Sequence, residues 1–276
     1  MNTVLVSLVS MGSLAALFAL GLAVAGRVFS VETDPKVDAV EEVLPGVNCG
    51  GCGFAGCRAF AEAVSSGKAP TNGCPVGGAR VAKLVAEILG VEAAAPVRRV
   101  AQVLCKGGLE EAKQRGDYDG PEDCRLAHAT QGGDKACAYG CLGYGSCVKA
   151  CAFDAMYMSD NGLPVVVEEN CTACGKCVEA CPRDIIILVP EEQGVHIRCR
   201  NLDPGRFIRQ VCSVGCIACQ RCVKTCPTGA IYMQDNLARI DYDKCTNCRK
   251  CVEVCPMKTI VWQEGKPLVL EKAAVS

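Results

Sequence analysis

The chain holds 24 cysteines in 276 residues, and most follow a spacing that binds iron-sulfur clusters. Two stretches carry the pattern C-x2-C-x2-C-x3-C-P, namely Cys216, Cys219, Cys222 and Cys226, and Cys245, Cys248, Cys251 and Cys255. Aromatic residues make up only 5% of the chain, so a conventional large core looks thin. Ligation can supply the missing folding free energy. The cysteines therefore predict a fold built around redox clusters.

Two other uses of so many cysteines are disfavoured. Disulfides need an oxidising compartment, and C-x2-C-x2-C places three thiols too close together for sensible pairing. Zinc usually takes two isolated C-x2-C pairs for each site, which the triplets followed by C-P do not match. The formal net charge of -1 also argues against a nucleic-acid partner.

The first 26 residues contain no charge, and the first charged side chain is Arg27. As a helix they would span about 39 Å, enough to cross a hydrocarbon core of about 30 Å. We expect a single-pass anchor over residues 1–29 in the lipid of the cell (inner) membrane. Arg27 and the reducing cytoplasm favour cluster domains on the cytoplasmic side. A cleaved signal peptide is the alternative, but the basic n-region is missing and the apolar stretch is too long.

A small helical domain is expected over residues 30–92. Helices are predicted from Arg58 to Val64 and from Gly78 to Leu89. Four cysteines of this unit fit one [4Fe-4S] cluster, Cys49, Cys52, Cys57 and Cys74. Gly51, Gly53 and Gly56 also match G-x-G-x-x-G, but no strand is expected before them, so a dinucleotide site is rejected.

The rest of the chain is an array with four similar segments, after Cys151, Cys181, Cys226 and Cys255. Each combines a cysteine loop, a short helix and a strand. The array predicts two tandem bacterial-type 2[4Fe-4S] ferredoxin-like modules, at 137–189 and 215–276. Connecting segments 93–136 and 190–214 precede them. The overall class is α+β.

In ferredoxins of this type the fourth cysteine of each run binds the neighbouring cluster. The crossed rule predicts four ligand sets: Cys137, Cys141, Cys147 and Cys181; Cys151, Cys171, Cys174 and Cys177; Cys216, Cys219, Cys222 and Cys255; Cys226, Cys245, Cys248 and Cys251. The first half of the first module departs from the pattern, because it reads C-x3-C-x5-C-x3-C and Ala152 replaces the proline. That proline normally stiffens the turn after the ligand.

Five clusters use twenty cysteines and leave Cys105, Cys124, Cys199 and Cys212. They fall in two matched pairs, one before each module, which favours a sixth cluster held by these four. The alternative is that some are buried free thiols. We see no catalytic residues, no flavin or NAD motif, and no clear role for His128 or His196.

The N-terminal span, the first cysteine module and the ferredoxin array together resemble the B subunit of the Rnf complex, an ion-translocating ferredoxin:NAD oxidoreductase. The most specific stretches are Asn48 to Gly53 and Tyr139 to Cys147, and the extra module resembles the longer form of this protein. The resemblance implies electron exchange with soluble ferredoxin and delivery to other membrane subunits. NAD reduction and ion movement would then take place on those subunits.

Two other functions are kept as alternatives. An anchored polyferredoxin could serve another membrane enzyme such as a hydrogenase, although the module from Asn48 to Cys57 disfavours this. A membrane-bound iron-sulfur sensor or scaffold would need one labile cluster, whereas duplicated crossed motifs hold clusters close together and suit an electron relay.

Overall fold

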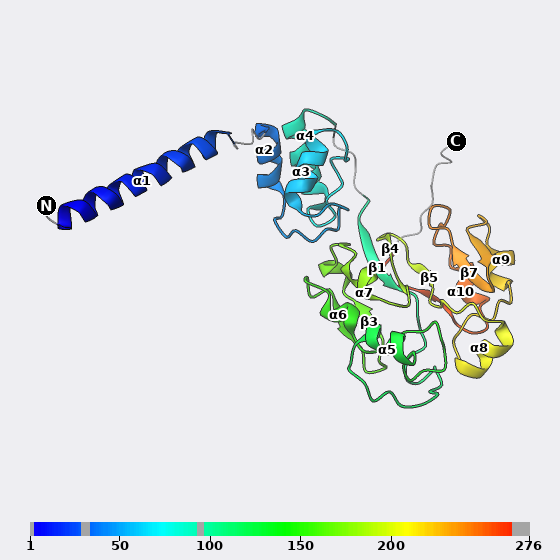
Figure 1. The fold of residues 1–276 in the computed structure, drawn as a ribbon. Helices are drawn as coiled ribbons and strands as arrows, with labels where there is room; N and C mark the ends of the chain where they lie inside the picture. Colours follow the sequence, from blue (N-terminus) through cyan, green and yellow to red (C-terminus); the bar gives the residue numbers. More distant parts are fainter. Residues whose placement is uncertain (1–2, 29–33, 93–96, 267–276) are drawn as a thin grey trace.

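A computed structural model describes residues 3–28, 34–92 and 97–266 (Figure 1). Along the chain they form an isolated helix, a small helical domain and two ferredoxin-like modules. Residues 93–96, at the start of the connecting segment 93–136, and residues 267–276, at the end of the expected second module, lie outside the described residues. The predicted α+β class with an N-terminal helix is confirmed.

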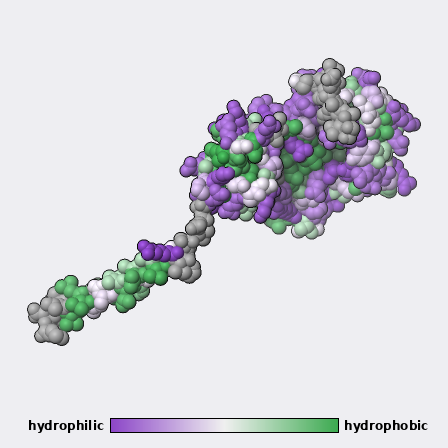
Figure 2. All heavy atoms as spheres, turned by 90° about the horizontal axis from the view of Figure 1, so that it is seen from above, coloured by the Kyte–Doolittle hydropathy of each residue, from purple (hydrophilic) through white to green (hydrophobic). Residues whose placement is uncertain are grey.

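Helix α1 (Thr3–Val28) packs against no other part of the described chain. Its large apolar side chains from Val6 onward are exposed, with Met11 73% accessible. The hydroxyl groups of Ser10 and Ser13 donate to backbone carbonyls three residues earlier, so these donors are satisfied within the helix. Figure 2 shows the resulting apolar rod, and Val6–Arg27 has the length and composition of a membrane span.

The small helical domain consists of α2 (Pro35–Val43), α3 (Cys57–Ser65) and α4 (Gly78–Leu89). Asp34 caps α2 through its carboxylate, and Gly90 ends α4 in the left-handed conformation. The apolar faces of the three helices meet around Phe60, which is 1% exposed. The sequence predicted α3 and α4 within two residues.

The first module contains β1 (Arg99–Val103), α5 (Cys124–Thr130), α6 (Ser146–Lys149), β2 (Met156–Met158), β3 (Pro164–Val166), the 3-10 helix η1 (Glu168–Asn170), α7 (Lys176–Ala180) and β4 (Ile186–Pro190). β1 pairs antiparallel with β4, and β2 with β3. The strand that opens the module therefore pairs with the strand that closes it.

The second module repeats this plan with β5 (Val195–Ile197), α8 (Gly205–Val211), α9 (Arg221–Thr225), β6 (Ile231–Gln234), β7 (Leu237–Ile240), α10 (Lys250–Glu253) and β8 (Ile260–Trp262). β5 pairs with β8, and β6 with β7, both antiparallel. Strands β1 and β5 lie in the segments treated above as connections. The sequence predicts both strands, because strand-like runs from Arg99 to Leu104 and from Gly194 to Arg198 precede Cys105 and Cys199.

The core of each module combines short apolar strands with cysteine side chains. In the first module, Ile186 and Val103 pack with the sulfur-bearing residues Cys141, Cys147 and Cys177. Strands of three to five residues bury little apolar surface, so the groups bound by these cysteines contribute to the stability of the modules.

We expect Phe60→Ala to destabilise the helical domain by about 3–5 kcal/mol, because it removes a fully buried ring from a small core. Amide hydrogen exchange in α3 and α4 of the full chain should accelerate by roughly a hundredfold to a few thousandfold, with the second module unchanged. Phe207→Ala is the matched control, since Phe207 on α8 is 45% exposed. Unchanged protection of α3 and α4 would contradict this account of the core.

Candidate iron-sulfur sites

The N-terminal site is formed by Cys49, Cys52, Cys57 and Cys74, which line one cavity. The Asn48 side chain accepts a hydrogen bond from the amide of Cys57 at 2.8 Å and holds the loop against the start of α3. Cys74 accepts from the amide of Gly77 at 3.4 Å. Burial raises the pKa of the Cys74 thiol, and the charges of Cys52, Cys57 and Cys49 raise it further. The four expected residues are thus brought together.

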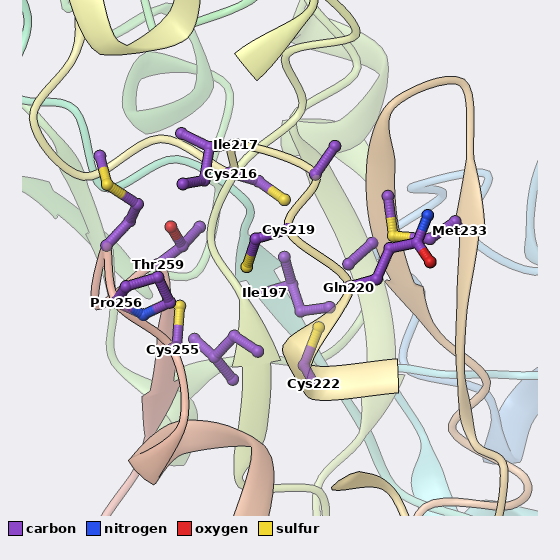
Figure 3. A pocket seen from close by; sticks show the side chains of 14 residues that line it. Ile197, Cys216, Ile217, Cys219, Gln220, Cys222, Met233, Cys255, Pro256 and Thr259 are labelled. Atoms are coloured by element: carbon purple, nitrogen blue, oxygen red, sulfur yellow. The ribbon is translucent and has the colours of Figure 1, made fainter. Parts of the chain in front are cut away.

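In the second module, the Cys222 site comprises Cys216, Cys219, Cys222 and Cys255, which line one cavity. Figure 3 shows their sulfur atoms facing a common space, with apolar side chains such as Ile197 and Met233 around it. Burial and the charges of its three partners raise the pKa of Cys222 to about 11.

Two further groups match the crossed pattern, one in each module. At the Cys177 site, burial and then the charges of neighbouring thiolates raise the pKa of Cys177 to about 12, and these neighbours include the expected Cys171, Cys174 and Cys151. At the Cys251 site, burial and the charges of neighbours that include Cys245, Cys248 and Cys226 raise the pKa of Cys251 to about 12 in the same way.

The remaining eight cysteines are grouped differently from the sequence expectation. The Cys147 site is lined by Cys124, Cys141, Cys147 and Cys181. The bridging site, between the modules, is lined by Cys105, Cys137, Cys199 and Cys212. Compared with the predicted sets, Cys124 and Cys137 have exchanged places.

Backbone pairing explains the position of Cys137. The segment from Ala112 to Gln114 runs between two partners, forming bridges to Cys212 on one side and to Lys135 on the other. Lys113 donates its amide to Val211 at 2.8 Å and accepts from the amide of Ala136 at 2.7 Å. Cys137 and Cys212 are therefore carried to the same cavity.

A cap explains the position of Cys124. Asp123 caps helix α5, and its carboxylate also accepts from the hydroxyl of Ser146 at 3.1 Å. That hydroxyl in turn accepts from the amide of Cys124 at 2.8 Å. Because Ser146 directly precedes Cys147, the pair of bonds fixes Cys124 beside the Cys147 site.

A signal for this exchange is present in the sequence. Cys137-x3-Cys141 has the same spacing as Cys212-x3-Cys216, so Cys137 corresponds to Cys212 of the other module. The counterpart of Cys219 is then missing from the first module, where five residues separate Cys141 from Cys147. Cys124 takes that place from a distant segment, which spacing alone does not indicate.

Direct contacts connect neighbouring sites. A Cβ on Gly51 would lie 2.9 Å from the carbonyl oxygen of Cys174, so glycine lets the N-terminal loop touch the loop of the Cys177 site. The amide of Cys141 donates to the sulfur of Cys105 at 3.4 Å, joining the Cys147 site to the bridging site.

Charge interactions reveal the other neighbours. Burial chiefly raises the pKa of Cys199 to about 12, and the charge of Cys216 also raises it. The bridging site therefore also adjoins the Cys222 site. Within the modules, Cys177 interacts with Cys147, and Cys251 interacts with Cys222.

The donor sets fit [4Fe-4S] clusters. All 24 cysteines are free thiols, and six sets of four account for each of them once. Among the described residues, no three Cys, His, Asp or Glu side chains lie close enough together to hold a single metal ion. A zinc site would need that closeness, because its cysteine ligands lie about 2.3 Å from the ion. Four of the six sets each line a cavity of their own with four cysteines, which is the donor set of a [4Fe-4S] cluster.

Neither of the two histidines is among the described residues that line the four cysteine cavities. His128 is exposed on α5. His196 is buried on β5, and its Nδ1 lies 3.0 Å from the hydroxyl of Tyr242, while burial lowers its pKa to about 4. His196 is therefore a neutral core residue at physiological pH.

Comparison with known families agrees with this geometry. An Fe-S cluster family matches residues 44–76, and 4Fe-4S dicluster domains match 136–186 and 215–259. These domains fit an electron-transfer protein.

Comparison with curated proteins extends the likeness along the chain. The chain is 50% identical to the B subunit of the Na(+)-translocating ferredoxin:NAD(+) oxidoreductase complex of Acetobacterium woodii, over 89% of this chain and 74% of that protein. It is 47% identical to the proton-translocating counterpart of Clostridium ljungdahlii, covering 89% and 87%. The B subunit of the ion-translocating oxidoreductase complex of Methanosarcina acetivorans is 45% identical, covering 89% and 94%. The chain belongs to the family of B subunits of ion-translocating oxidoreductase (Rnf) complexes.

Proposed function

We propose that this chain is a membrane-anchored electron relay with six [4Fe-4S] sites, held on the cytoplasmic side by α1. The observation that carries the proposal is the grouping of all 24 cysteines into six sets of four. The proposed ligands of the bridging site are Cys105, Cys137, Cys199 and Cys212, and those of the Cys147 site are Cys124, Cys141, Cys147 and Cys181. The other four sets are those that the sequence predicted.

A bound [4Fe-4S] cluster accepts and returns one electron at a time, and the chain's own residues set the distance and surroundings of each site. Burial raises the pKa of four single thiols, those of Cys147, Cys177, Cys222 and Cys251, to about 11 or 12, so these four are protonated at neutral pH without a metal. Cluster binding requires their thiolates and therefore releases protons. Backbone amides, such as that of Ala101 3.4 Å from the sulfur of Cys171, donate to the sulfurs and stabilise their charge.

Short helices keep paired sites close. Cys147 and Cys151 belong to different sites and are four residues apart, with Cys147 on α6 and Cys151 just after it. The same spacing separates Cys222 from Cys226 in the second module. With the contacts between sites, this gives one linear order: N-terminal site, Cys177 site, Cys147 site, bridging site, Cys222 site and Cys251 site.

The N-terminal end of this order and the Cys222 site, which is next to its other end, suit different partners. The N-terminal site lies nearest in sequence to α1, so we assign to it electron exchange with the other membrane subunits. Cys219 in the second module is the one exposed cysteine among the 24, and the described residues that line its cavity are all uncharged. A soluble ferredoxin would exchange electrons near Cys219.

Ion movement and NAD chemistry are assigned to other subunits. Helix α1 carries no charged residue before Arg27, and a lone apolar helix offers no ion path. Relatives named for sodium and for proton translocation are similarly close to this chain. The choice between sodium and proton as the translocated ion therefore does not depend on large differences in the sequence of the B subunit.

Double variants distinguish the two groupings of cysteines. In anaerobically purified full-length protein, Cys137→Ala with Cys212→Ala should lose about four iron atoms, since both residues belong to one site. Cys124→Ala with Cys212→Ala should lose about eight, because two sites are broken. Iron and sulfide analysis measures both, and the opposite result would restore the grouping expected from the sequence.

The intact chain, purified anaerobically in detergent, should contain about 24 iron atoms, which is six clusters of four. A content of about twenty would leave only five clusters. After reduction by dithionite the isolated chain should transfer electrons to an oxidised ferredoxin and should not reduce NAD. Reduction of NAD by this chain alone would contradict the proposed division of labour.

A further inference from the structure

The bridging site differs from the other three cavities that are lined by four cysteines in the charges around it. Lys135, Arg198 and Arg200 line it, and among the described residues no carboxylate does. The described linings of the N-terminal and Cys222 cavities contain no charged residue, and that of the Cys147 site contains one, Arg183. Three cations thus gather at the site that lies between the modules.

Lys135 is the most enclosed of these cations, being only 4% exposed. Its ammonium donates to the carbonyl of Gly107 at 3.0 Å, two residues after Cys105. Its charge interacts with Cys105, a residue of this site, and with Cys141 of the adjoining Cys147 site. A buried charge at this position is weakly screened by water and salt.

The neighbouring charges leave the site with a positive surrounding. Arg198 donates through Nε to the carbonyl of Val103 at 3.2 Å, which joins the two modules beside the site. Glu111 is the carboxylate whose charge acts on Cys212. It accepts hydrogen bonds from the amide of Gly108 and the side chain of Asn161. Asp184 interacts with Arg200. The lining of the site therefore contains three cations, and the two carboxylates that interact with its residues lie outside that lining.

We propose that Lys135, with Arg198 and Arg200, raises the reduction potential of the bridging site, so that an electron moving along the chain is held between the two modules. Each electron added makes a cluster and its thiolates more negative, and a fixed cation stabilises that reduced state. The electron comes from one adjoining site and leaves to the other, with no bond formed or broken. This inference rests on the proposed function, because it needs a cluster at the bridging site.

The test uses Lys135→Gln in the full-length, anaerobically purified protein. Glutamine keeps a donor for the carbonyl of Gly107 and removes the charge. In a dithionite titration followed by electron paramagnetic resonance, one cluster should become harder to reduce by about tenfold in its one-electron equilibrium constant, which is about 59 mV. Lys135→Arg should retain the wild-type potential, and Lys83→Gln, on the exposed face of α4, should change nothing.

The signal is assigned by Cys212→Ala, which should delete the cluster that responds to Lys135→Gln. If Cys212→Ala removes no cluster, the six-site function fails. If it removes one, and Lys135→Gln keeps full iron with unchanged potentials, only the role of Lys135 is overturned. Should Lys135→Gln lose iron, Arg200→Gln replaces it, with the same direction expected and an unchanged potential again overturning the proposal.

Discussion

The structure depends on bringing four thiols around each cavity in a chain that has few other means of forming a core. Strands of three to five residues and helices of four to seven residues cannot stabilise the modules by packing alone. Buried thiols replace much of the apolar core, and a bound cluster would hold them as thiolates and so cross-link distant segments. Folding and cluster binding are therefore coupled in this protein.

The sequence predicted most of this arrangement because its signals are local. Gly78 to Leu89 forms the expected helix, and the runs at Cys216 and Cys245 lead to the expected crossed sites. The exchange of Cys124 and Cys137 depends on contacts between segments far apart, the Ser146 bond to Cys124 and the strand-like bridges of Ala112 and Gln114. Spacing between neighbouring cysteines carries no information about such contacts.

The charged residues around the sites could not be predicted from local sequence patterns either. Lys135 stands two residues before Cys137 and has no neighbouring motif that would mark it as buried. Its position becomes meaningful only when Gly107 and Cys105, about thirty residues earlier, fold over it. A buried cation near a thiolate site is therefore identified from the structure, whereas most of the cysteine ligands can be identified from the sequence.

The bridging site follows from the duplication of the module. Each module contributes one cysteine after its opening strand, Cys105 or Cys199, and one at the start of its C-x3-C pair, Cys137 or Cys212. Either module alone would present half of a site, two thiols that cannot complete a cluster. In the proposed relay, association of the two halves ties the electron path to the packing of the modules, because the contact that joins them is also the step that an electron would take between them.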